Sequence, residues 1–393
     1  MNMKTTDGGT TIEGGWPQEA KFEPTFRGYE YSNQENFNRE IEKIWMKSWL
    51  LAGRVEEVPN VGDYFTVQFE KENLIIMRTQ SGSIETYYNV CMHRGSLLCT
   101  EEKGHMSKGY ITCPYHSWMY DSENGKLLSA PNIPKGIEGF SCENVRLNSV
   151  KTEIWDGYIW INLDPEAPSL EESFHLPKSW SIYEKYDMKN LKVGAQKTYT
   201  VEANWKLIME NASECYHCGN IHPELSRVTP PNRPRKWIDK DIPDTTVLKH
   251  VGAMELKPGL ERVNMDGKAY RQPFENLTEE DVSKIFYLHI FPHCYICMSA
   301  DYVFIAALWP LAVDKTIIKG YWMFTPEVLE NGEPIQDAID IWDITSKEDW
   351  EACEWAQQGN QSRVYENGGI LTPIDWRVAK FKHYVHEELA KPV

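Results

Sequence analysis

Two short groups of cysteine and histidine restrict the fold of this chain more than any other feature. Cys91 and His93 form the first group, and Cys113 and His116 form the second, with nineteen residues between the groups. Each group offers one thiolate and one imidazole, so neither completes a four-ligand site alone. The chain must therefore bring the groups together, either around a zinc ion or around a [2Fe-2S] cluster with cysteine on one iron and histidine on the other.

The order of the ligands favours the [2Fe-2S] cluster. Structural zinc sites commonly pair cysteine with cysteine and histidine with histidine. Here each group mixes the two residue types, which lets each short loop supply one ligand to each iron. Spacing alone leaves a distorted zinc site as an open alternative.

A second set of metal-binding residue types follows about a hundred residues later. Glu214 and His217 lie three apart in segment 202–218, whose pattern is helical, so they share one helical face. His217 and His222 lie five apart, an offset of about 140° on a straight α-helix. Both bind one ion only if the helix loosens or breaks between them, and we expect such a break. Two histidines with one distant carboxylate form the facial triad of non-haem Fe(II) oxygenases.

Both sets resemble the signatures of the Rieske non-haem iron oxygenases. The stretch CMHRGSLL…CPYHSW is similar to the Rieske motif of that family, with a slightly longer spacer and with Ser117 where the family usually has glycine. The later stretch NWK…EN…ECYHC…HP is similar to the catalytic signature of the same family. The resemblance covers the chain from about Tyr29 to the C-terminal helix.

This resemblance implies the cofactors and their ligands. It implies a Rieske [2Fe-2S] cluster, a mononuclear Fe(II), O₂ as co-substrate, and NAD(P)H oxidised by a separate flavin or iron-sulfur reductase, possibly through a ferredoxin. It also implies a head-to-tail homotrimer in which His116 serves the iron of a neighbouring subunit. The implied roles are Cys91, His93, Cys113 and His116 for the [2Fe-2S] cluster, His217 and His222 for the mononuclear iron, and Glu214 as the acid that bridges the two centres.

The third ligand of the mononuclear iron must lie downstream. We choose Asp349, because its surroundings resemble the family's Glu-Asp step followed by a Gln-x-Gly-x-x-Ser stretch. Glu348 and Glu351 are the main alternatives. We expect a helix to begin here, with Thr345 and Glu348 forming a capping box that leaves Asp349 free, or with Ser346 pairing with Asp349 instead.

The hydrophobic pattern predicts an α+β protein in three sequence regions. Residues 1–45 contain a poorly ordered arm and most of a helix, predicted over 32–49 and capped by Ser32, and this part belongs with the catalytic domain. Short strand-like runs between turn residues predict an all-β Rieske domain over 46–165. Residues 166–393 form the catalytic domain, for which the resemblance implies a helix-grip (START-like) fold, an antiparallel sheet around a long helix.

Composition excludes several other classes. The formal net charge of -17, from 41 basic and 58 acidic residues, argues against binding nucleic acid or an anionic membrane. The N-terminus lacks the apolar segment of a signal peptide, and the longest apolar run, 302–313, is too short to span a bilayer. We therefore expect a cytoplasmic protein whose paired cysteines, Cys215 with Cys218 and Cys294 with Cys297, are buried thiols.

The resemblance also implies a substrate class. The bridging acid is glutamate, where ring-hydroxylating dioxygenases usually carry aspartate, and this looks like the branch that includes carnitine, choline, glycine betaine and stachydrine oxygenases. A quaternary ammonium group prefers an aromatic cage with an acid nearby. Strand-like residues 286–324 offer the aromatic side chains Phe286, Tyr287, Phe291, Tyr295, Tyr302, Phe304, Trp309, Tyr321, Trp322 and Phe324.

We therefore interpret the chain as the terminal oxygenase component, hydroxylating or N-demethylating a small quaternary ammonium compound. An oxygenase acting on an aromatic acid or a hydrophobic arene is the first alternative. A Rieske electron carrier and a zinc-structured binding protein are remote alternatives, because neither requires the set formed by Glu214, His217 and His222.

Overall fold

The chain divides into two compact units, which we describe separately. The small unit is Met46–Leu170, and the large unit combines Met1–Trp45 with Glu171–Val393. Most of the predicted N-terminal arm lies outside the described residues. The computed structural model describes residues 4–6, 9–11, 21–133, 138–174, 181–230 and 248–392.

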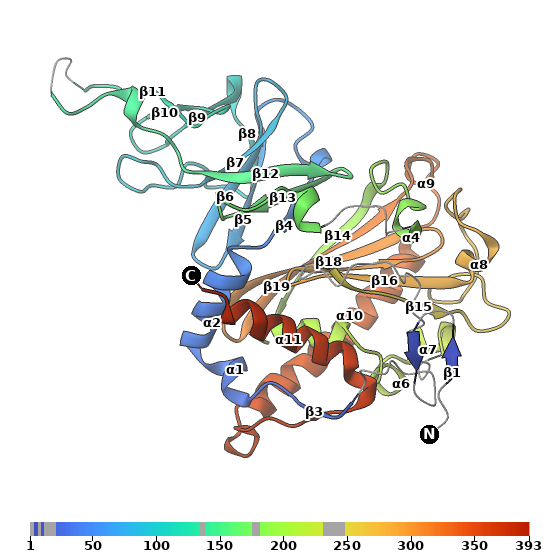
Figure 1. Ribbon diagram of the computed structural model, residues 1–393. Helices are drawn as coiled ribbons and strands as arrows, with labels where there is room; N and C mark the ends of the chain where they lie inside the picture. Colours follow the sequence, from blue (N-terminus) through green and yellow to red (C-terminus); the bar gives the residue numbers. More distant parts are fainter. Residues whose placement is uncertain are drawn as a thin grey trace. The chain divides into compact units, whose positions relative to one another are not determined.

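The small unit is built on a seven-stranded antiparallel sheet with the strand order β4-β13-β12-β7-β6-β5-β8 (Figure 1). Its strands alternate between buried and less buried residues, or are buried throughout, as strands that face a core do. The predicted all-β organisation of this region is confirmed. The strands are β4 (Leu50–Arg54), β5 (Asp63–Phe69), β6 (Glu72–Arg78), β7 (Ile84–Tyr88), β8 (Lys103–His105), β12 (Ser149–Trp155) and β13 (Tyr158–Asn162).

A second, three-stranded sheet carries the second cysteine and histidine group. Its order is β11-β10-β9, formed by β9 (Tyr110–Thr112), β10 (Met119–Asp121) and β11 (Leu127–Ser129). The first Cys/His group follows β7, and the second connects β9 to β10. The core beneath both groups includes Ile111, Tyr120, Leu127 and Leu147. Short 3₁₀ turns occur at Val55–Glu57 (η2), Ser107–Gly109 (η3) and Cys142–Asn144 (η4).

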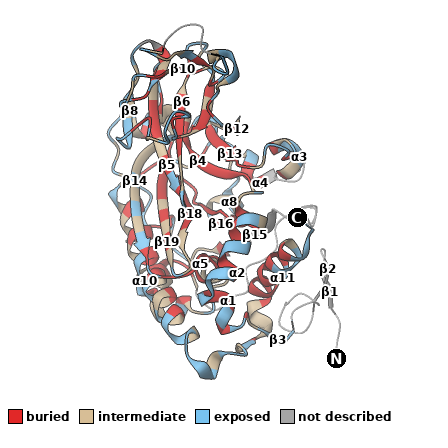
Figure 2. Cartoon of the chain, turned by 90° about the vertical axis from the view of Figure 1, so that its left-hand side faces the viewer, coloured by how far each residue is buried: buried red, intermediate tan, exposed pale blue. Residues whose placement is uncertain are grey.

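The large unit contains a six-stranded antiparallel sheet with the order β14-β19-β18-β17-β16-β15. Its strands are rich in β-branched and aromatic residues, and the first eight residues of β18 are buried (Figure 2). Burial on both faces explains why 294–298 and 303–310 read as continuous apolar runs, whereas the edge strand over 192–201 is mostly exposed or half-buried. The strands are β14 (Lys192–Val201), β15 (Leu248–Glu255), β16 (Lys284–Ile290), β17 (Cys294–Met298), β18 (Val303–Ala312) and β19 (Lys315–Phe324).

Helix α10 (Gln336–Asn360) packs against this sheet, below it in the view of Figure 1. The Trp342 ring stacks on Phe304 of β18 with centroids 5.4 Å apart. The Trp322 indole of β19 donates a hydrogen bond to the Ala338 carbonyl at 3.1 Å. An antiparallel sheet that holds a long helix is the expected helix-grip architecture, so the predicted fold class is confirmed.

The predicted start of this helix near residue 349 was wrong. Helix α10 begins thirteen residues earlier, so Thr345, Ser346 and Glu348 lie inside it and none of them forms an N-terminal cap. Burial of Trp342 against the sheet extends the helix toward its N-terminus, and this tertiary contact outweighs the local capping pattern.

The single helix predicted to start at Ser32 is divided. Helix α1 (Gly28–Ser32) ends there, and α2 (Gln34–Glu40) continues into a π-helical turn, η1 (Ile41–Trp45). Asn33 is the actual cap, since its side chain accepts a hydrogen bond from the backbone N–H of Asn36 at 2.9 Å. The Ser32 hydroxyl donates back to the Gly28 carbonyl at 3.1 Å instead.

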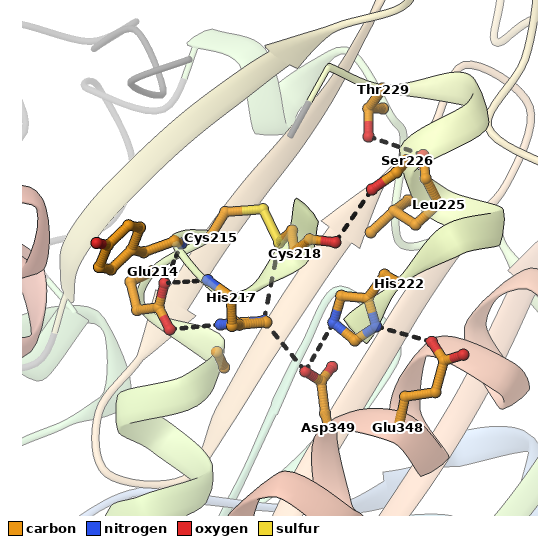
Figure 3. Close-up of a disulfide and its surroundings, with 12 residues drawn as sticks. Glu214, Cys215, His217, Cys218, His222, Leu225, Ser226, Thr229, Glu348 and Asp349 are labelled. Carbon is orange, nitrogen blue, oxygen red and sulfur yellow. Dashed lines mark hydrogen bonds and ion pairs between the residues drawn. A yellow bond between two sulfur atoms is a disulfide. The ribbon is translucent and has the colours of Figure 1, made fainter. Parts of the chain in front are cut away.

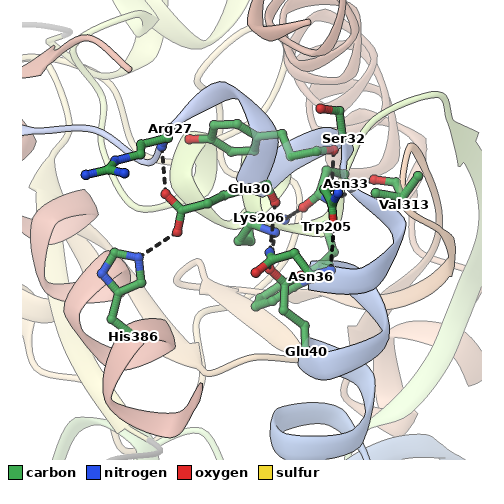
Figure 4. Close-up of polar contacts among 12 residues, drawn as sticks. Arg27, Glu30, Ser32, Asn33, Asn36, Glu40, Trp205, Lys206, Val313 and His386 are labelled. Atoms are coloured by element: carbon green, nitrogen blue, oxygen red, sulfur yellow. Dashed lines mark hydrogen bonds and ion pairs between the residues drawn. The ribbon is translucent and has the colours of Figure 1, made fainter. Parts of the chain in front are cut away.

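Buried charges join these N-terminal helices to helix α5 (Trp205–Ala212) (Figure 4). The Lys206 ammonium lies 2.6 Å from a Glu40 carboxylate oxygen, and both side chains are at most 1% exposed. The Trp205 indole donates to the other Glu40 oxygen at 2.8 Å. Removing one partner of such a pair costs about 3–5 kcal/mol, so the network fixes the start of α5.

The remaining elements are short, apart from helix α11. Helix α11 (Trp376–Ala390) matches the helix predicted over 376–389. Within the described ranges, no helix is long and apolar enough to cross a membrane. The others are α3 (Leu170–Phe174), α4 (Ser181–Glu184), α6 (Cys218–Ile221), α7 (Pro223–Val228), α8 (Glu279–Val282), α9 (Pro326–Glu330), η5 (Arg363–Tyr365), η6 (Pro373–Asp375), and the pairs β1 (Lys4–Thr6) with β2 (Gly9–Thr11) and β3 (Glu23–Pro24) with β20 (Ile370–Leu371).

Candidate metal centres

Two tight turns hold the cysteines of the small unit. In the first turn, the Gly95 N–H donates to the Cys91 carbonyl at 2.9 Å, and the Cys91 N–H donates to the Ser96 carbonyl at 2.8 Å. In the second turn, the Ser117 N–H donates to the Cys113 carbonyl at 3.0 Å. Each cysteine therefore begins a turn closed by its own backbone, which fixes the direction of its side chain.

Both turns need one residue in the left-handed backbone region. Gly95 has φ of +71° and Ser117 has φ of +56°. A residue with a Cβ atom is strained in this region, whereas glycine is not. The backbone thus gives a physical reason for the glycine that the family usually has at position 117.

The four side chains on these turns form one donor set. Cys91 and Cys113 are each 1% exposed, whereas His93 is exposed and His116 is partly buried, with the two imidazole centroids 4.7 Å apart. The Tyr120 oxygen accepts the Met92 N–H at 3.2 Å and lies 3.2 Å from the Cys91 sulfur. Two inner thiols with two outer imidazoles suit a [2Fe-2S] cluster that takes cysteine on one iron and histidine on the other.

In the large unit, the helix predicted over 202–218 breaks, but the break does not lie between the two histidines as expected. Helix α5 ends at Ala212, six residues before the predicted end of the helix. His217 precedes the short helix α6, and His222 follows it with φ of -115° and ψ of 74°, outside the helical region. Pro223 then starts α7. Because His222 leaves the helical region at the end of α6, the splay that a straight helix would impose on the two histidines is removed.

The two histidines converge on Asp349 of α10, which lies 127 residues beyond His222 in the sequence (Figure 3). The Nε2 atom of His222 lies 2.9 Å from Oδ1 of Asp349, and the Nε2 atom of His217 lies 3.2 Å from the same oxygen. The structure therefore brings together the two imidazole nitrogens and the carboxylate oxygen of a 2-His-1-carboxylate set.

Each histidine has a further carboxylate partner at its other ring nitrogen. The Nδ1 atom of His217 bonds to Glu214, and the Nδ1 atom of His222 lies 2.8 Å from an oxygen of Glu348. Metal-binding histidines usually donate this second N–H to a carboxylate or a carbonyl, which fixes the tautomer and the ring orientation. Of the features of this site, this pattern gives the strongest support for a divalent metal ion in the donor set.

The electrostatics of the donor set agree with this arrangement. Burial acts to lower the pKa of His217, but hydrogen bonds to Asp349 and Glu214 outweigh it and raise that pKa to about 9. Burial acts to raise the pKa of Asp349, but hydrogen bonds from His217 and His222 lower it to about 2. Without a metal, a proton on histidine balances the carboxylate, and a cation at this point would replace that proton.

The prediction of buried thiols was wrong for one cysteine pair. Cys215 and Cys218 form a disulfide beside His217, with Cα atoms 5.0 Å apart (Figure 3). The turn through the two intervening residues brings the two side chains together, and the sequence pattern did not specify this turn. Cys294 and Cys297 are free and buried, as expected.

A pocket opens at the three converging ligands. Tyr287, Tyr295 and Trp342 contribute aromatic walls, and Tyr287 meets Trp342 edge to face with centroids 6.4 Å apart. Among the described residues, the lining includes acidic side chains and no lysine or arginine. The lining residues are Asn211, Ala212, Glu214, Cys215, His217, Cys218, His222, Leu225, Tyr287, Tyr295, Cys297, Trp342, Thr345, Ser346 and Asp349.

Sequence reasoning missed part of this site. Of the ten aromatic candidates in 286–324, only Tyr287 and Tyr295 line the pocket. Trp342 and Thr345 were not considered as pocket residues, although they precede Asp349 by seven and four positions and so share its helical face. Glu348 was considered only as a cap or an alternative ligand, and its contact with His222 depends on the tertiary fold.

Comparison with known protein families matches both units. Residues 188–391 match the model of the ring hydroxylating alpha subunit, catalytic domain, and residues 48–151 match the model of the Rieske [2Fe-2S] domain. The first match alone covers more than half of the chain.

Individual relatives agree with these matches. The glycine betaine monooxygenase oxygenase subunit of Pseudomonas aeruginosa is 29% identical over 392 residues, covering 92% of this chain and 90% of the relative. The carnitine monooxygenase oxygenase subunit of Escherichia coli is 34% identical over 196 residues, covering 50% and 51% of the two chains. The crystal structure of the quaternary ammonium Rieske monooxygenase CntA with its substrate L-carnitine aligns with a TM-score of 0.75 at 25% identity, covering 94% of this chain and 97% of that chain. The chain therefore belongs to the ring-hydroxylating oxygenase α subunits and carries a Rieske [2Fe-2S] domain before its catalytic domain.

Proposed function

We propose that this protein is the terminal oxygenase component of a multicomponent, NAD(P)H- and O₂-dependent system that hydroxylates or N-demethylates a small quaternary ammonium compound. The observation that carries the proposal is the convergence of His217, His222 and Asp349 at a pocket with aromatic walls. The names of the glycine betaine and carnitine relatives, and of CntA, support the substrate class.

Each metal centre has its own donor set in this proposal. His217, His222 and Asp349 hold the mononuclear iron, which when bound supplies the O₂ chemistry. Glu214 holds Nδ1 of His217 and, as the bridging acid, connects this histidine to the electron donor. The [2Fe-2S] cluster belongs to Cys91, His93, Cys113 and His116.

The aromatic walls of the pocket suit a quaternary ammonium cation, which has no N–H group to donate. Tyr287, Tyr295 and Trp342 offer π faces, and a cation over such a face gains about 0.5–2 kcal/mol. The nearby carboxylates of Asp349 and Glu214 favour a positive charge further. A neutral arene gains only the aromatic contacts, which is why the arene alternative takes second place.

The partners of the protein also belong to this proposal. A flavin or iron-sulfur reductase, possibly through a ferredoxin, supplies the electrons, and a homotrimer places His116 of one subunit at the iron of the next. Inter-subunit electron transfer is described for a quaternary ammonium Rieske monooxygenase of similar structure, which supports this arrangement. The cytoplasmic location stays a prediction from the sequence.

A single-turnover experiment tests the proposal without the natural reductase. Each sample of chemically reduced, iron-loaded protein receives ¹⁸O₂ and one candidate substrate. The candidates are carnitine, choline, glycine betaine, proline betaine, benzoate and salicylate. We expect ¹⁸O in the product of a quaternary ammonium compound, or formaldehyde if an N-methyl group is lost. Products from an arene alone would contradict the substrate class. Oxidation of the [2Fe-2S] cluster without any product would support the electron-carrier alternative.

A further inference from the structure

The Cys215–Cys218 disulfide lies at the metal-ligand set, and the proposed function gives it no role. The two cysteines flank His217 closely in the sequence, and both line the pocket. Cys218 is 4% exposed, whereas Cys215 is half-buried. A redox-active pair that touches a metal ligand can change the ligand set itself, so we consider where its sulfur atoms lie.

The Cys218 sulfur lies on the metal side of His217. It is 3.7 Å from Nε2 of His217, the same nitrogen that lies 3.2 Å from Oδ1 of Asp349 (Figure 3). This sulfur and one ring nitrogen each of His217 and His222 all lie within 4.8 Å of one another. Tetrahedral zinc, with bonds of about 2.0–2.1 Å to nitrogen and about 2.3 Å to sulfur, holds such ligands about 3.5 Å apart. The sulfur therefore lies where a fourth ligand of the same metal ion would lie.

Backbone contacts hold Cys218 in place independently of the disulfide. Cys218 is the first residue of α6, and its carbonyl accepts hydrogen bonds from the His222 N–H at 3.2 Å and from the Ser226 hydroxyl at 3.0 Å. Opening the disulfide leaves these two hydrogen bonds intact. The reduced sulfur thus stays within reach of the metal site.

The oxidation state of the pair decides whether this sulfur binds a metal. A thiolate is a metal ligand, whereas a disulfide sulfur has no negative charge to offer. With the disulfide closed, the protein ligands are His217, His222 and Asp349, and a site with three protein ligands keeps a position open for reaction. With the pair reduced, Cys218 becomes a fourth protein ligand, and sites with four protein ligands are closed. The soft thiolate also shifts the metal preference toward zinc.

Reduction of the pair releases the inner sulfur. Cys215 is the more exposed cysteine, so a dithiol reductant attacks its Sγ atom as a thiolate. A bond forms between the reductant sulfur and Cys215, the bond from Cys215 to Cys218 breaks, and Cys218 leaves as a thiolate. The second thiol of the reductant then displaces Cys215 and closes the reductant's own disulfide. The dithiol supplies both electrons; one of its protons stays on Cys215, and the other passes to solvent when Cys218 binds the metal.

We propose that Cys218 is a redox-controlled fourth ligand of the mononuclear metal site. The disulfide keeps the site open, and a dithiol reductant converts it into a closed site that prefers zinc to iron. This inference rests on the metal site of the proposed function and adds to it that the redox state of the Cys215–Cys218 pair sets both the coordination and the metal preference.

X-ray absorption at the zinc edge tests the inference, because it reports the ligands of zinc without interference from the iron of the [2Fe-2S] cluster. The mononuclear site of the cluster-loaded protein is emptied with a chelator and filled with zinc. One sample is untreated, and the other has first been reduced with dithiothreitol, which is then removed in the absence of air. The cluster occupies Cys91 and Cys113, so these thiolates are not available to zinc.

Three variants accompany the wild type. Cys218→Ser removes the proposed ligand, and Cys215→Ser leaves Cys218 as a free thiol whatever the treatment. Cys142→Ser is the control, because Cys142 is a free, half-buried cysteine of the small unit. The visible absorption of the [2Fe-2S] cluster shows that each variant is folded.

We expect one sulfur neighbour of zinc at about 2.3 Å in the reduced wild type and none in the untreated wild type. Cys215→Ser should show this sulfur with and without dithiothreitol, and Cys218→Ser should show only nitrogen and oxygen ligands in both samples. Cys142→Ser should behave as the wild type. Competition with a chelator should show a zinc affinity at least about a hundredfold higher in the reduced wild type than in the untreated one.

Other results would overturn the inference in distinguishable ways. Only nitrogen and oxygen ligands in the reduced wild type and in Cys215→Ser, or a sulfur ligand that persists in Cys218→Ser, would remove Cys218 from the site while leaving the three-ligand set intact. A sulfur ligand in the untreated wild type would contradict control by the disulfide. Failure of the untreated wild type to bind zinc at all would contradict the three-ligand set, and the proposed function with it.

Discussion

The two candidate metal centres are assembled in opposite ways. In the small unit, all four donors lie between positions 91 and 116, on two turns that close through their own backbone hydrogen bonds. In the large unit, the histidines flank a short helix, and Asp349 arrives from α10, 127 residues beyond His222. The first centre depends on local turn geometry, whereas the second depends on how a sheet positions a long helix.

The centres also differ in their surroundings. His93 is exposed and His116 is half-buried, as suits donors of an electron-transfer centre. His222 is 1% exposed, and a carboxylate at Nδ1 holds each histidine of the large unit. We infer that one centre is built for exchange with a partner and the other for a fixed geometry inside a pocket. The following predictions test that difference, beginning with the largest effect.

Removing the distant ligand should disable only the second centre. Asp349→Ala takes away one of three ligands, so we expect turnover to fall by at least about a thousandfold and divalent metal binding to be lost. The visible absorption of the [2Fe-2S] cluster should stay unchanged. Glu351→Ala, on the exposed side of the same helix, is the control and should behave as the wild type. Loss of metal in Glu351→Ala instead would mean that the ligand was assigned incorrectly.

Removing the carboxylate behind His222 should weaken the same centre without abolishing it. Glu348→Ala leaves Nδ1 of His222 without its 2.8 Å partner, and loss of such a partner typically lowers metal affinity by about tenfold to a hundredfold. Co(II) titration of the metal-free protein measures the affinity, with Glu351→Ala as the matched control. Unchanged affinity in Glu348→Ala would show that packing alone orients His222.

The large unit should lose stability with rising pH through Glu210. Burial raises the pKa of this α5 residue to about 8 from 4.5, although hydrogen bonds from Tyr31 act to lower it. A raised carboxyl pKa contributes stability that is complete below about pH 4.5 and is lost as pH rises to about 8.

Between pH 6 and 7 this loss is about 1 kcal/mol, and Glu210→Gln should remove it. Hydrogen exchange of the α5 amides at the two pH values measures the change, with Glu351→Gln as the control. The same pH slope in Glu210→Gln and in the wild type would assign the loss to another group.

The smallest effect concerns a turn of the small unit. Ser117 adopts φ of +56°, so Ser117→Gly should relieve strain and stabilise the small unit by about 0.5–1 kcal/mol. Urea denaturation followed by loss of the [2Fe-2S] absorption measures this gain. Gly95→Ala, in the corresponding position of the other turn, should have the opposite sign. A destabilised Ser117→Gly variant would show that the serine side chain has a role of its own.

The same contrast explains what the sequence could predict. The two Cys/His turns and the strands around them follow from local patterns. The five-residue spacing of His217 and His222 correctly indicates that they do not share one straight helix, although the breaks lie before His217 and at His222 rather than between them. The start of α10 does not follow from a local pattern, because burial of Trp342 against the sheet outweighs the capping pattern at Thr345.

Contacts between residues far apart in the sequence could not be predicted either. The partnership of Glu348 with His222 joins residues 126 positions apart, and no local pattern encodes it. Aromatic residues were correctly expected in the pocket, yet which rings face it depends on the register of the strands. Tyr287 and Tyr295 face the pocket, whereas Trp322 of β19 donates to the Ala338 carbonyl on α10.

The central claim is that one chain carries two separate metal centres with the donors named above. Electron paramagnetic resonance of the reduced protein with nitric oxide tests it most directly, because the reduced [2Fe-2S] cluster and the iron nitrosyl give distinct signals in one spectrum. We predict both signals in the wild type, loss of only the nitrosyl signal in His222→Ala, and loss of only the cluster signal in Cys113→Ser. A nitrosyl signal that persists in His222→Ala, or its absence from iron-replete wild type, would contradict the account.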